Sequence, residues 1–229
     1  MSAPPPVRID DIGGILVVRD DLIPGGTKRR VLGPLLAGAD EWVYASPAQG
    51  YAQVALAHAC RETGKRATVF VARRREPHKR TREAIEAGAH VVQVPVGYLT
   101  VVAARARAYA AETGAGLLPF GFDTPAFVAA LADLARSLSL SPPEVWCVAG
   151  SGTLSRALQQ AWPEAAHHAV RIGAAPRAGV ARLYQAPEPF ERDATLLPPF
   201  PSCSNYDAKA WRFITRHASP GSVFWNVAG

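Results

Sequence analysis

The sequence predicts an α/β fold with two open parallel sheets that are flanked by helices. Predicted strands and helices alternate along the 229 residues, and most of the strands are continuously apolar, as strands buried on both faces are. Turns rich in Gly, Ser and Pro follow several of these strands. Because ligands of such folds bind in loops at the carboxyl ends of strands, these turns are the first candidates for a functional site.

Each predicted element rests on a local pattern. Apolar runs predict strands at residues 15–18, 42–45, 67–72, 90–94, 144–149, 170–172 and 223–227. Stretches rich in Ala and Leu predict a helix that opens within 24–30 and continues to 36, and others at 51–61, 77–88, 99–111, 125–138, 153–162 and 206–217. Glycines stop several of these helices, at Gly64, Gly88 and Gly114. Residues 176–201 are Pro-rich and carry no clear pattern.

The composition excludes a membrane protein and a disulfide-rich secreted domain. Hydrophobic residues make up 48% of the chain and charged residues 19%, which suits a globular core, and no apolar run approaches the roughly 20 residues that span a bilayer. The N-terminal residues 1–6 lack the apolar core of a signal peptide. Cys60, Cys147 and Cys203 are odd in number and widely spaced, so we expect buried thiols, a cytoplasmic protein and no metal site.

The charge pattern points to an anionic partner or to a solvated surface. The net charge is +6, and six of the ten residues from 73 to 82 are Lys or Arg. Such a run is either an exposed loop and helix start or a patch for the phosphates of a nucleic acid or a phosphorylated ligand. The residues of the candidate nucleic-acid patch are Arg73, Arg74, Arg75, Lys79 and Arg80.

A glycine-framed lysine follows the first predicted strand. Gly25 and Gly26 give the backbone unusual freedom, and Thr27 can cap the helix that opens there. Lys28 is followed by Arg29 and Arg30, and like charge should disfavour its ammonium form. A neutral amine can attack a carbonyl. The alternative interpretation is a solvated basic helix start.

A second strand-end turn, at 150–155, has the composition of an anion site. Backbone amides at a helix N-terminus bind phosphate, and serine and threonine add hydroxyl donors. The alternative is a tight turn with a threonine cap. The turn is neither a P-loop nor a good dinucleotide fingerprint. A placed lysine, a small polar loop at 46–50 and this turn together predict pyridoxal 5'-phosphate, which needs an amine, a phosphate cradle and a partner for its ring nitrogen.

At several positions in order, the sequence resembles the fold type II pyridoxal-phosphate enzymes, in the branch of 1-aminocyclopropane-1-carboxylate deaminase and D-cysteine desulfhydrase. Residues 19–30 are similar to that branch's R-E-D-L…G-G-N-K-x-R-K, and residues 49–55 to its S-N-Q-T-R-Q-V-A loop. Residues 118–122 resemble I-P-x-G-G, and residues 205–210 resemble V-Y-E-G-K-A. The chain departs from the pattern in its shortness, in one glycine fewer at the cradle, and in Ala48-Gln49 where the family has Ser-Asn.

The resemblance implies a role for each matched residue. Lys28 would be the Schiff-base lysine, Tyr206 an active-site residue near the substrate, and Asp207 the acid on the pyridine nitrogen. The cofactor's phosphate would lie on Gly150, Ser151, Gly152, Thr153 and Leu154, with Gln49 near its ring. The substrate carboxylate would be held by Ser46, Ala48, Gln49, Gly50 and Tyr51.

The resemblance also implies an organisation and a reaction. We expect a larger cofactor-binding lobe of residues 1–40 and 115–229, a smaller lobe of residues 41–114, and a homodimer. The enzyme would act on an amino-acid group through a carbanion, as a lyase, deaminase or decarboxylase. A short chain leaves the site without its usual covering loops, and together with the basic run this suggests an amino acid linked to a modified DNA base. Bacteriophages that hypermodify thymine use pyridoxal-phosphate enzymes on such groups, and this compact chain resembles them.

Two other classes of protein fit parts of the pattern. A nucleotide- or phosphoribosyl-binding protein would use residues 150–153 and would not need Lys28. A non-catalytic nucleic-acid-binding module would retain only the fold and the basic run.

Overall fold

The computed structural model describes residues 4–95, 97–173 and 176–229. The chain divides into two compact units, one built on residues 24–123 and the other on residues 5–23 and 124–229. Each unit has its own sheet and its own hydrophobic core. Among the described residues, no helix is both long and apolar enough to cross a bilayer.

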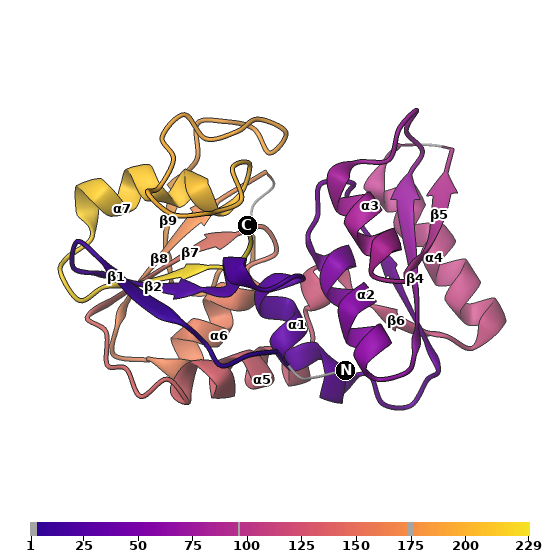
Figure 1. Ribbon diagram of the computed structural model, residues 1–229, viewed down its shortest axis with the longest axis horizontal. Helices are drawn as coiled ribbons and strands as arrows, with labels where there is room; N and C mark the ends of the chain where they lie inside the picture. Colours follow the sequence, from indigo (N-terminus) through magenta and orange to yellow (C-terminus); the bar gives the residue numbers. More distant parts are fainter. Residues whose placement is uncertain (1–3, 96, 174–175) are drawn as a thin grey trace. The chain divides into compact units, whose positions relative to one another are not determined.

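The first unit contains a four-stranded parallel sheet in the order β5-β4-β3-β6 (Figure 1). These strands are β3 (Glu41–Ala45), β4 (Arg66–Ala72), β5 (His90–Val94) and β6 (Gly116–Leu118). One face is covered by α4 (Leu99–Thr113), whose Val102, Ala106 and Ala110 pack on Val43 and Phe70. The other face carries α2 (Ala52–Glu62), which packs between α1 (Gly26–Leu32) and α3 (Lys79–Glu86).

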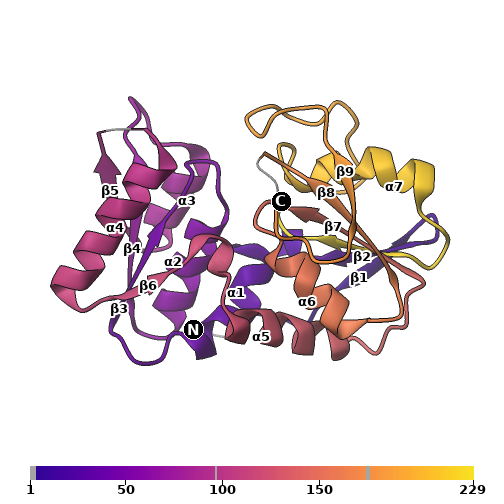
Figure 2. The same cartoon turned by 180° about the vertical axis from the view of Figure 1, so that it is seen from behind.

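The second unit contains a six-stranded sheet in the order β1-β2-β10-β7-β8-β9. Its strands are β1 (Ile9–Ile12), β2 (Ile15–Arg19), β7 (Glu144–Ala149), β8 (Ala166–Arg171), β9 (Arg182–Gln185) and β10 (Val223–Asn226). The pairs are parallel except for β1, which runs antiparallel to β2. The helices α5 (Pro125–Arg136) and α6 (Thr153–Ala161) cover one face, and α7 (Trp211–His217) covers the other (Figures 1 and 2).

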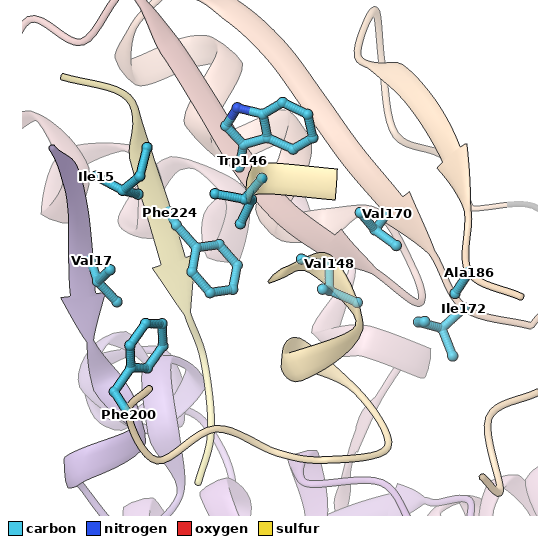
Figure 3. Packing of buried hydrophobic residues seen from close by; sticks show 11 residues of the cluster. Ile15, Val17, Trp146, Val148, Val170, Ile172, Ala186, Phe200 and Phe224 are labelled. Atoms are coloured by element: carbon cyan, nitrogen blue, oxygen red, sulfur yellow. The ribbon is translucent and has the colours of Figure 1, made fainter. Parts of the chain in front are cut away.

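Two-sided burial explains why the central strands are continuously apolar. In β7, Trp146 and Val148 point into the cluster on the α7 side, beside Phe200 and Phe224 (Figure 3). Their neighbours Val145, Cys147 and Ala149 belong to the cluster beneath α5 and α6. Successive side chains of a strand point to opposite faces, so both sets must be apolar when both faces are covered. The predicted α/β class with two open, helix-flanked sheets is thereby confirmed, with one antiparallel edge strand that was not predicted.

The three strands absent from the sequence prediction lie at sheet edges. β1 carries two aspartates and turns at Gly13-Gly14 into β2. β6 is only three residues long and ends before Pro119. β9 lies within the Pro-rich segment and leaves Leu183 45% exposed. Edge strands are buried less, so their sequences show less of the apolar pattern.

The observed units and the predicted lobes share most of their residues and differ over two segments. Residues 24–40 and 115–123 were placed with the larger lobe, whereas in the structure they pack with residues 41–114. Two contacts explain the first difference. The Arg29 guanidinium pairs with Glu62 on α2, and the Trp42 indole N–H donates to the Leu36 carbonyl at 3.1 Å. Both join the segment after Pro24 to the smaller unit.

Candidate functional site

The lysine turn is shaped by close backbone packing at Gly25. Gly25 has a φ of +88°, and a Cβ there would lie 3.0 Å from the Ala55 Cα and 3.2 Å from the Arg29 side chain. Only glycine meets both demands, since a positive φ and this proximity each disfavour a side chain. The Gly25 amide donates to the Tyr51 hydroxyl at 3.2 Å. The turn that carries Lys28 is therefore fixed to α2 and to the residue before it.

The Lys28 amine is held rather than solvated. Its Nζ donates to the Gly121 carbonyl oxygen at 2.9 Å and lies 5.4 Å from the centroid of the Phe122 ring. Burial lowers the pKa of Lys28 from 10.5 to about 8, against the opposing charge of Asp123. The predicted direction of this shift is confirmed.

The predicted cause of that shift is wrong. Repulsion by Arg29 and Arg30 was expected to disfavour the ammonium, but loss of water around the amine is what lowers the pKa of Lys28. The Arg29 guanidinium faces Glu62, and its Nη1 donates to the Pro24 carbonyl at 2.9 Å. Its charge is thus compensated on the side of α2.

The loop at 46–51 joins β3 to α2 and is braced from inside. The Gln53 Nε2 donates to the carbonyl oxygens of Ala48 at 3.0 Å and Gly50 at 2.9 Å. Ser46 is buried and its Oγ donates to the Pro47 carbonyl at 2.9 Å, while a Cβ on Gly50 would lie 2.9 Å from that Oγ. Sequence reasoning did not single out Gln53. Its signal is a fully buried polar residue in an otherwise apolar helix face.

This bracing separates the predicted substrate contacts into two kinds. Ser46 and Ala48 are buried, and the Ser46 hydroxyl is engaged within the loop. Gln49 and Gly50 remain partly exposed. The polar groups that the loop offers are therefore the Gln49 side chain and the backbone amides at the start of α2.

Arg80 does not belong to the predicted nucleic-acid patch. It is 8% exposed, its guanidinium carbon lies 4.3 Å from the centroid of the Tyr51 ring, and its Nη1 donates to Glu83 Oε2 at 2.9 Å. Arg80 thereby packs on the loop that contains Tyr51. Lys79 is exposed and lies 3.8 Å from the Glu83 carboxylate.

The remaining members of that patch, Arg73, Arg74 and Arg75, are exposed in the loop after β4. The backbone of this loop is fixed: the Arg73 amide donates to the Val94 carbonyl at 2.8 Å, and the Arg74 amide donates to the Gln93 Oε1 at 3.3 Å.

In the second unit, residues Gly150, Ser151, Gly152, Thr153 and Leu154 connect β7 to α6. The Ser151 and Thr153 hydroxyls lie 2.9 Å apart, and the Thr153 amide donates to the Ser151 Oγ at 3.3 Å. The Leu154 side chain packs into the core beneath α6, so it offers only its backbone amide. Two hydroxyls and the first amides of a nine-residue helix form the anion-binding composition that the sequence predicted.

Gly152 is required by protein packing as well. Its φ is +89°, and a Cβ there would lie 2.2 Å from the Arg177 carbonyl oxygen and 2.9 Å from the Ala178 amide nitrogen. We therefore expect Gly152→Ala to lower the free energy of unfolding by more than about 2 kcal/mol. Urea denaturation followed by tryptophan fluorescence would measure this.

The matched control is Gly221→Ala, in the same unit. Gly221 has a φ of +84°, but the nearest atom to its added Cβ would be Pro143 Cδ at 3.7 Å. It should lose only the backbone term, about 1–2 kcal/mol. Equal losses in the two variants would contradict the packing argument.

Tyr206 connects this turn to the C-terminal part of the unit. Its hydroxyl accepts from the Gly150 amide at 2.9 Å and donates to the Val148 carbonyl at 3.4 Å. Burial raises the pKa of Tyr206, so the phenol stays protonated. The neighbouring Asp207 is fully buried, and its Oδ2 accepts from the Ala228 amide at 3.1 Å.

The predicted residues thus form two groups. Lys28 and the 46–51 loop belong to the first unit, and the 150–154 turn, Tyr206 and Asp207 belong to the second. The structure also shows a second buried lysine that sequence reasoning did not single out. The Lys209 Nζ donates to the Pro189 carbonyl at 2.8 Å, and burial lowers its pKa. Within the described ranges, no three His, Cys, Asp or Glu side chains gather as metal ligands would.

Comparison with known proteins gives a structural match without a sequence match. No protein-family model and no curated protein sequence matches the chain. An ACC deaminase homologue superposes with a TM-score of 0.82 at 13% identity, over 99% of this chain and 90% of that one. Diaminopropionate ammonia lyase from Escherichia coli gives 0.70 at 14% identity, over 100% and 84%. A threonine deaminase from T.th. gives 0.59 at 21%, over 96% and 75%.

The chain has the fold of the fold type II pyridoxal-phosphate enzymes. The predicted fold class is confirmed by these matches. The chain is shorter than these neighbours, since it covers 90%, 84% and 75% of their lengths while nearly all of its own residues are matched.

Proposed function

We propose that this protein is a pyridoxal-phosphate enzyme that acts on an amino-acid group, with Lys28 as the point of covalent attachment of the cofactor. One observation carries the proposal. In a chain whose fold matches an ACC deaminase homologue over 99% of its length, a lysine after a Gly-Gly turn has a buried amine with a pKa of about 8. An amine that is partly neutral near physiological pH can attack an aldehyde.

The residues present fit the chemistry of this cofactor. Lys28 provides the amine, while Ser151, Thr153 and the first amides of α6 provide hydrogen-bond donors for a phosphate. Asp207 provides a buried carboxylate for the ring nitrogen. When bound, pyridoxal phosphate withdraws electrons from the amino-acid carbon that loses a substituent.

The chain's own residues would bind the substrate and move its protons. The amides at the start of α2, an eleven-residue helix, and the Gln49 side chain would bind the substrate carboxylate. Lys28 would accept and return a proton, because its pKa of about 8 allows both charge states. Tyr206 would keep the Gly150 amide oriented through its hydroxyl.

The proposed reaction class is that of a lyase, with deamination as the first candidate and decarboxylation as the second. The names of the structural neighbours, ammonia lyases and threonine deaminases, support this choice. A nucleotide-binding protein that uses only the 150–154 turn is the alternative. It would leave the buried amine of Lys28 without a use.

Absorbance and peptide mapping test the proposal. Purified protein mixed with pyridoxal phosphate should gain a visible absorption band, and borohydride should fix the cofactor on the peptide that contains Lys28. Retention on another lysine such as Lys209, or no band at all, would refute the proposal.

A narrower proposal concerns the substrate and the setting. We propose an amino acid linked to a modified DNA base, as in the thymine hypermodification of bacteriophages, and a cytoplasmic homodimer. The exposed, consecutive side chains of Arg73, Arg74 and Arg75 support a polyanionic substrate, because guanidinium groups bind phosphates well. The three buried free cysteines suit a reducing compartment. Light scattering in solution would test the dimer.

Reversing the three arginines should separate a polymer-linked substrate from a free one. With Arg73, Arg74 and Arg75 changed to Glu, binding to duplex DNA should fall by about tenfold or more at moderate salt, since each phosphate contact releases counterions. The absorption band with pyridoxal phosphate should stay unchanged. The matched control is Lys79→Glu with Arg82→Glu. DNA affinity that is insensitive to both salt and the triple change would leave a free amino acid as the substrate.

A further inference from the structure

A phenylalanine beside Lys28 has a backbone conformation that rarely suits it. Gly121 has a φ of 72° and ψ of 3°, and Phe122 follows with a φ of 58°. Left-handed conformations are ordinary for glycine and strained for a residue with a bulky side chain. Such strain persists only where the surroundings compensate for it, and it gathers at functional positions.

The surroundings of Phe122 do compensate. Its side chain is fully buried, and its ring meets the Tyr44 ring edge to face, with centroids 5.0 Å apart and planes at 70°. The Tyr44 hydroxyl accepts from the Gly121 amide at 3.4 Å. Burial of an aromatic ring in this geometry is strongly favourable. The ring therefore holds the turn in its left-handed form.

The strained turn determines where one carbonyl points. In the peptide group between Gly121 and Phe122, the amide of Phe122 donates to the Pro119 carbonyl at 2.9 Å. The carbonyl of the same group accepts from Lys28 Nζ at 2.9 Å. With both ends of this group bonded, the position of the Lys28 amine depends on the backbone of Phe122.

We propose that Phe122 is a positioning residue for Lys28: its left-handed backbone aims the Gly121 carbonyl at the lysine amine, and its ring keeps water away from that amine. This inference rests on the proposed role of Lys28. It adds the residue that places the amine and keeps it available for reaction.

The charges around the amine leave burial as the main influence on it. Asp123 favours the ammonium form, Arg29 is paired with Glu62, and Arg30 lies on the same helix. The buried Tyr44 hydroxyl, whose pKa is raised to about 12, stays neutral. With a pKa of about 8 instead of 10.5, the neutral amine at about pH 7.5 increases from about 0.1% to about 24%, roughly 200-fold.

The test measures the titration of Lys28 in the protein without cofactor. Acetic anhydride labels neutral amines, so the labelling of the Lys28 peptide across a pH series gives the midpoint for this residue. Phe122→Gly keeps the left-handed backbone available and removes the ring. Phe122→Asn does the same with a residue that tolerates this conformation. In both variants the midpoint should rise by about one pH unit or more, which is about tenfold less neutral amine at about pH 7.5.

Two controls separate positioning from general loosening of the unit. Phe70→Leu removes a buried ring from the other face of the sheet in the same unit and should leave the Lys28 midpoint unchanged. Lys65, whose Nζ donates to the Ala39 carbonyl, is the internal reference in every variant. An unchanged midpoint in either Phe122 variant, or an equal rise in Phe70→Leu, would overturn the inference. Because no cofactor is present, the outcome does not depend on whether pyridoxal phosphate binds.

Discussion

Lys28→Ala is expected to abolish borohydride trapping of pyridoxal phosphate and to lower turnover by at least about a thousandfold. The variant removes the amine that burial has brought to a pKa of about 8 and the hydrogen bond that the amine donates to the Gly121 carbonyl. No other group on α1 can form a covalent bond to an aldehyde, because the guanidinium groups of Arg29 and Arg30 stay protonated. Steady-state kinetics and mass mapping after reduction would measure both losses.

Two lysines of the same chain serve as controls for that experiment. Lys65 donates to a backbone carbonyl at 2.6 Å in the same unit, as Lys28 does. Lys209 is the other buried lysine whose pKa is lowered. Lys65→Ala should retain trapping and turnover. If trapping survives in Lys28→Ala and disappears in Lys209→Ala, the attachment point is Lys209 and the proposed function of Lys28 is wrong.

Asp207→Asn is expected to lower turnover by about 100-fold or more while the protein stays folded. Asparagine keeps the shape of the side chain and an oxygen that can accept from the Ala228 amide, as the carboxylate does at 3.1 Å. It loses the negative charge that would keep the ring nitrogen of the cofactor protonated and electron-withdrawing. The absorption band with pyridoxal phosphate should persist, since Lys28 is untouched.

The matched control for this change is Asp20→Asn. Asp20 is also fully buried in the second unit, and its Oδ2 accepts from the Trp225 indole N–H at 3.0 Å. Any loss from burying an amide in place of a carboxylate should be seen in both variants by thermal denaturation. Only Asp207→Asn should lose turnover with stability retained. Comparable turnover losses in the two variants would mean that Asp207 acts through the fold alone.

The sequence was sufficient for the parts of the fold that depend on local pattern. The continuous apolar runs of β4 and β7 predicted strands buried on both faces, and each is covered by helices. The glycines before Lys28 predicted a placed lysine, and the packing at Gly25 agrees. Strands at sheet edges, such as β9, bury less apolar surface and therefore left no pattern to read.

Contacts between residues far apart in sequence were beyond such reasoning. Arg29 pairs with Glu62, 33 residues away, so the expected repulsion on Lys28 is compensated. Arg80 looked like part of a solvated basic run, but it stacks on Tyr51 from an earlier helix start. The carbonyl that accepts from Lys28 lies 93 residues further along the chain. In each case the local pattern identified the residue, and a distant partner set its environment.

The position of β10 within its sheet has a consequence for the order in which the two units can form. The strand is synthesised after every other strand of its sheet, yet it lies between β2 and β7 and pairs with both. The six-stranded sheet therefore has a gap at its centre until residues 223–226 have left the ribosome. Residues 24–123 are continuous and can fold during translation. Lys28 and its carbonyl partner would then be in place while the strand beside Trp146 is still being made.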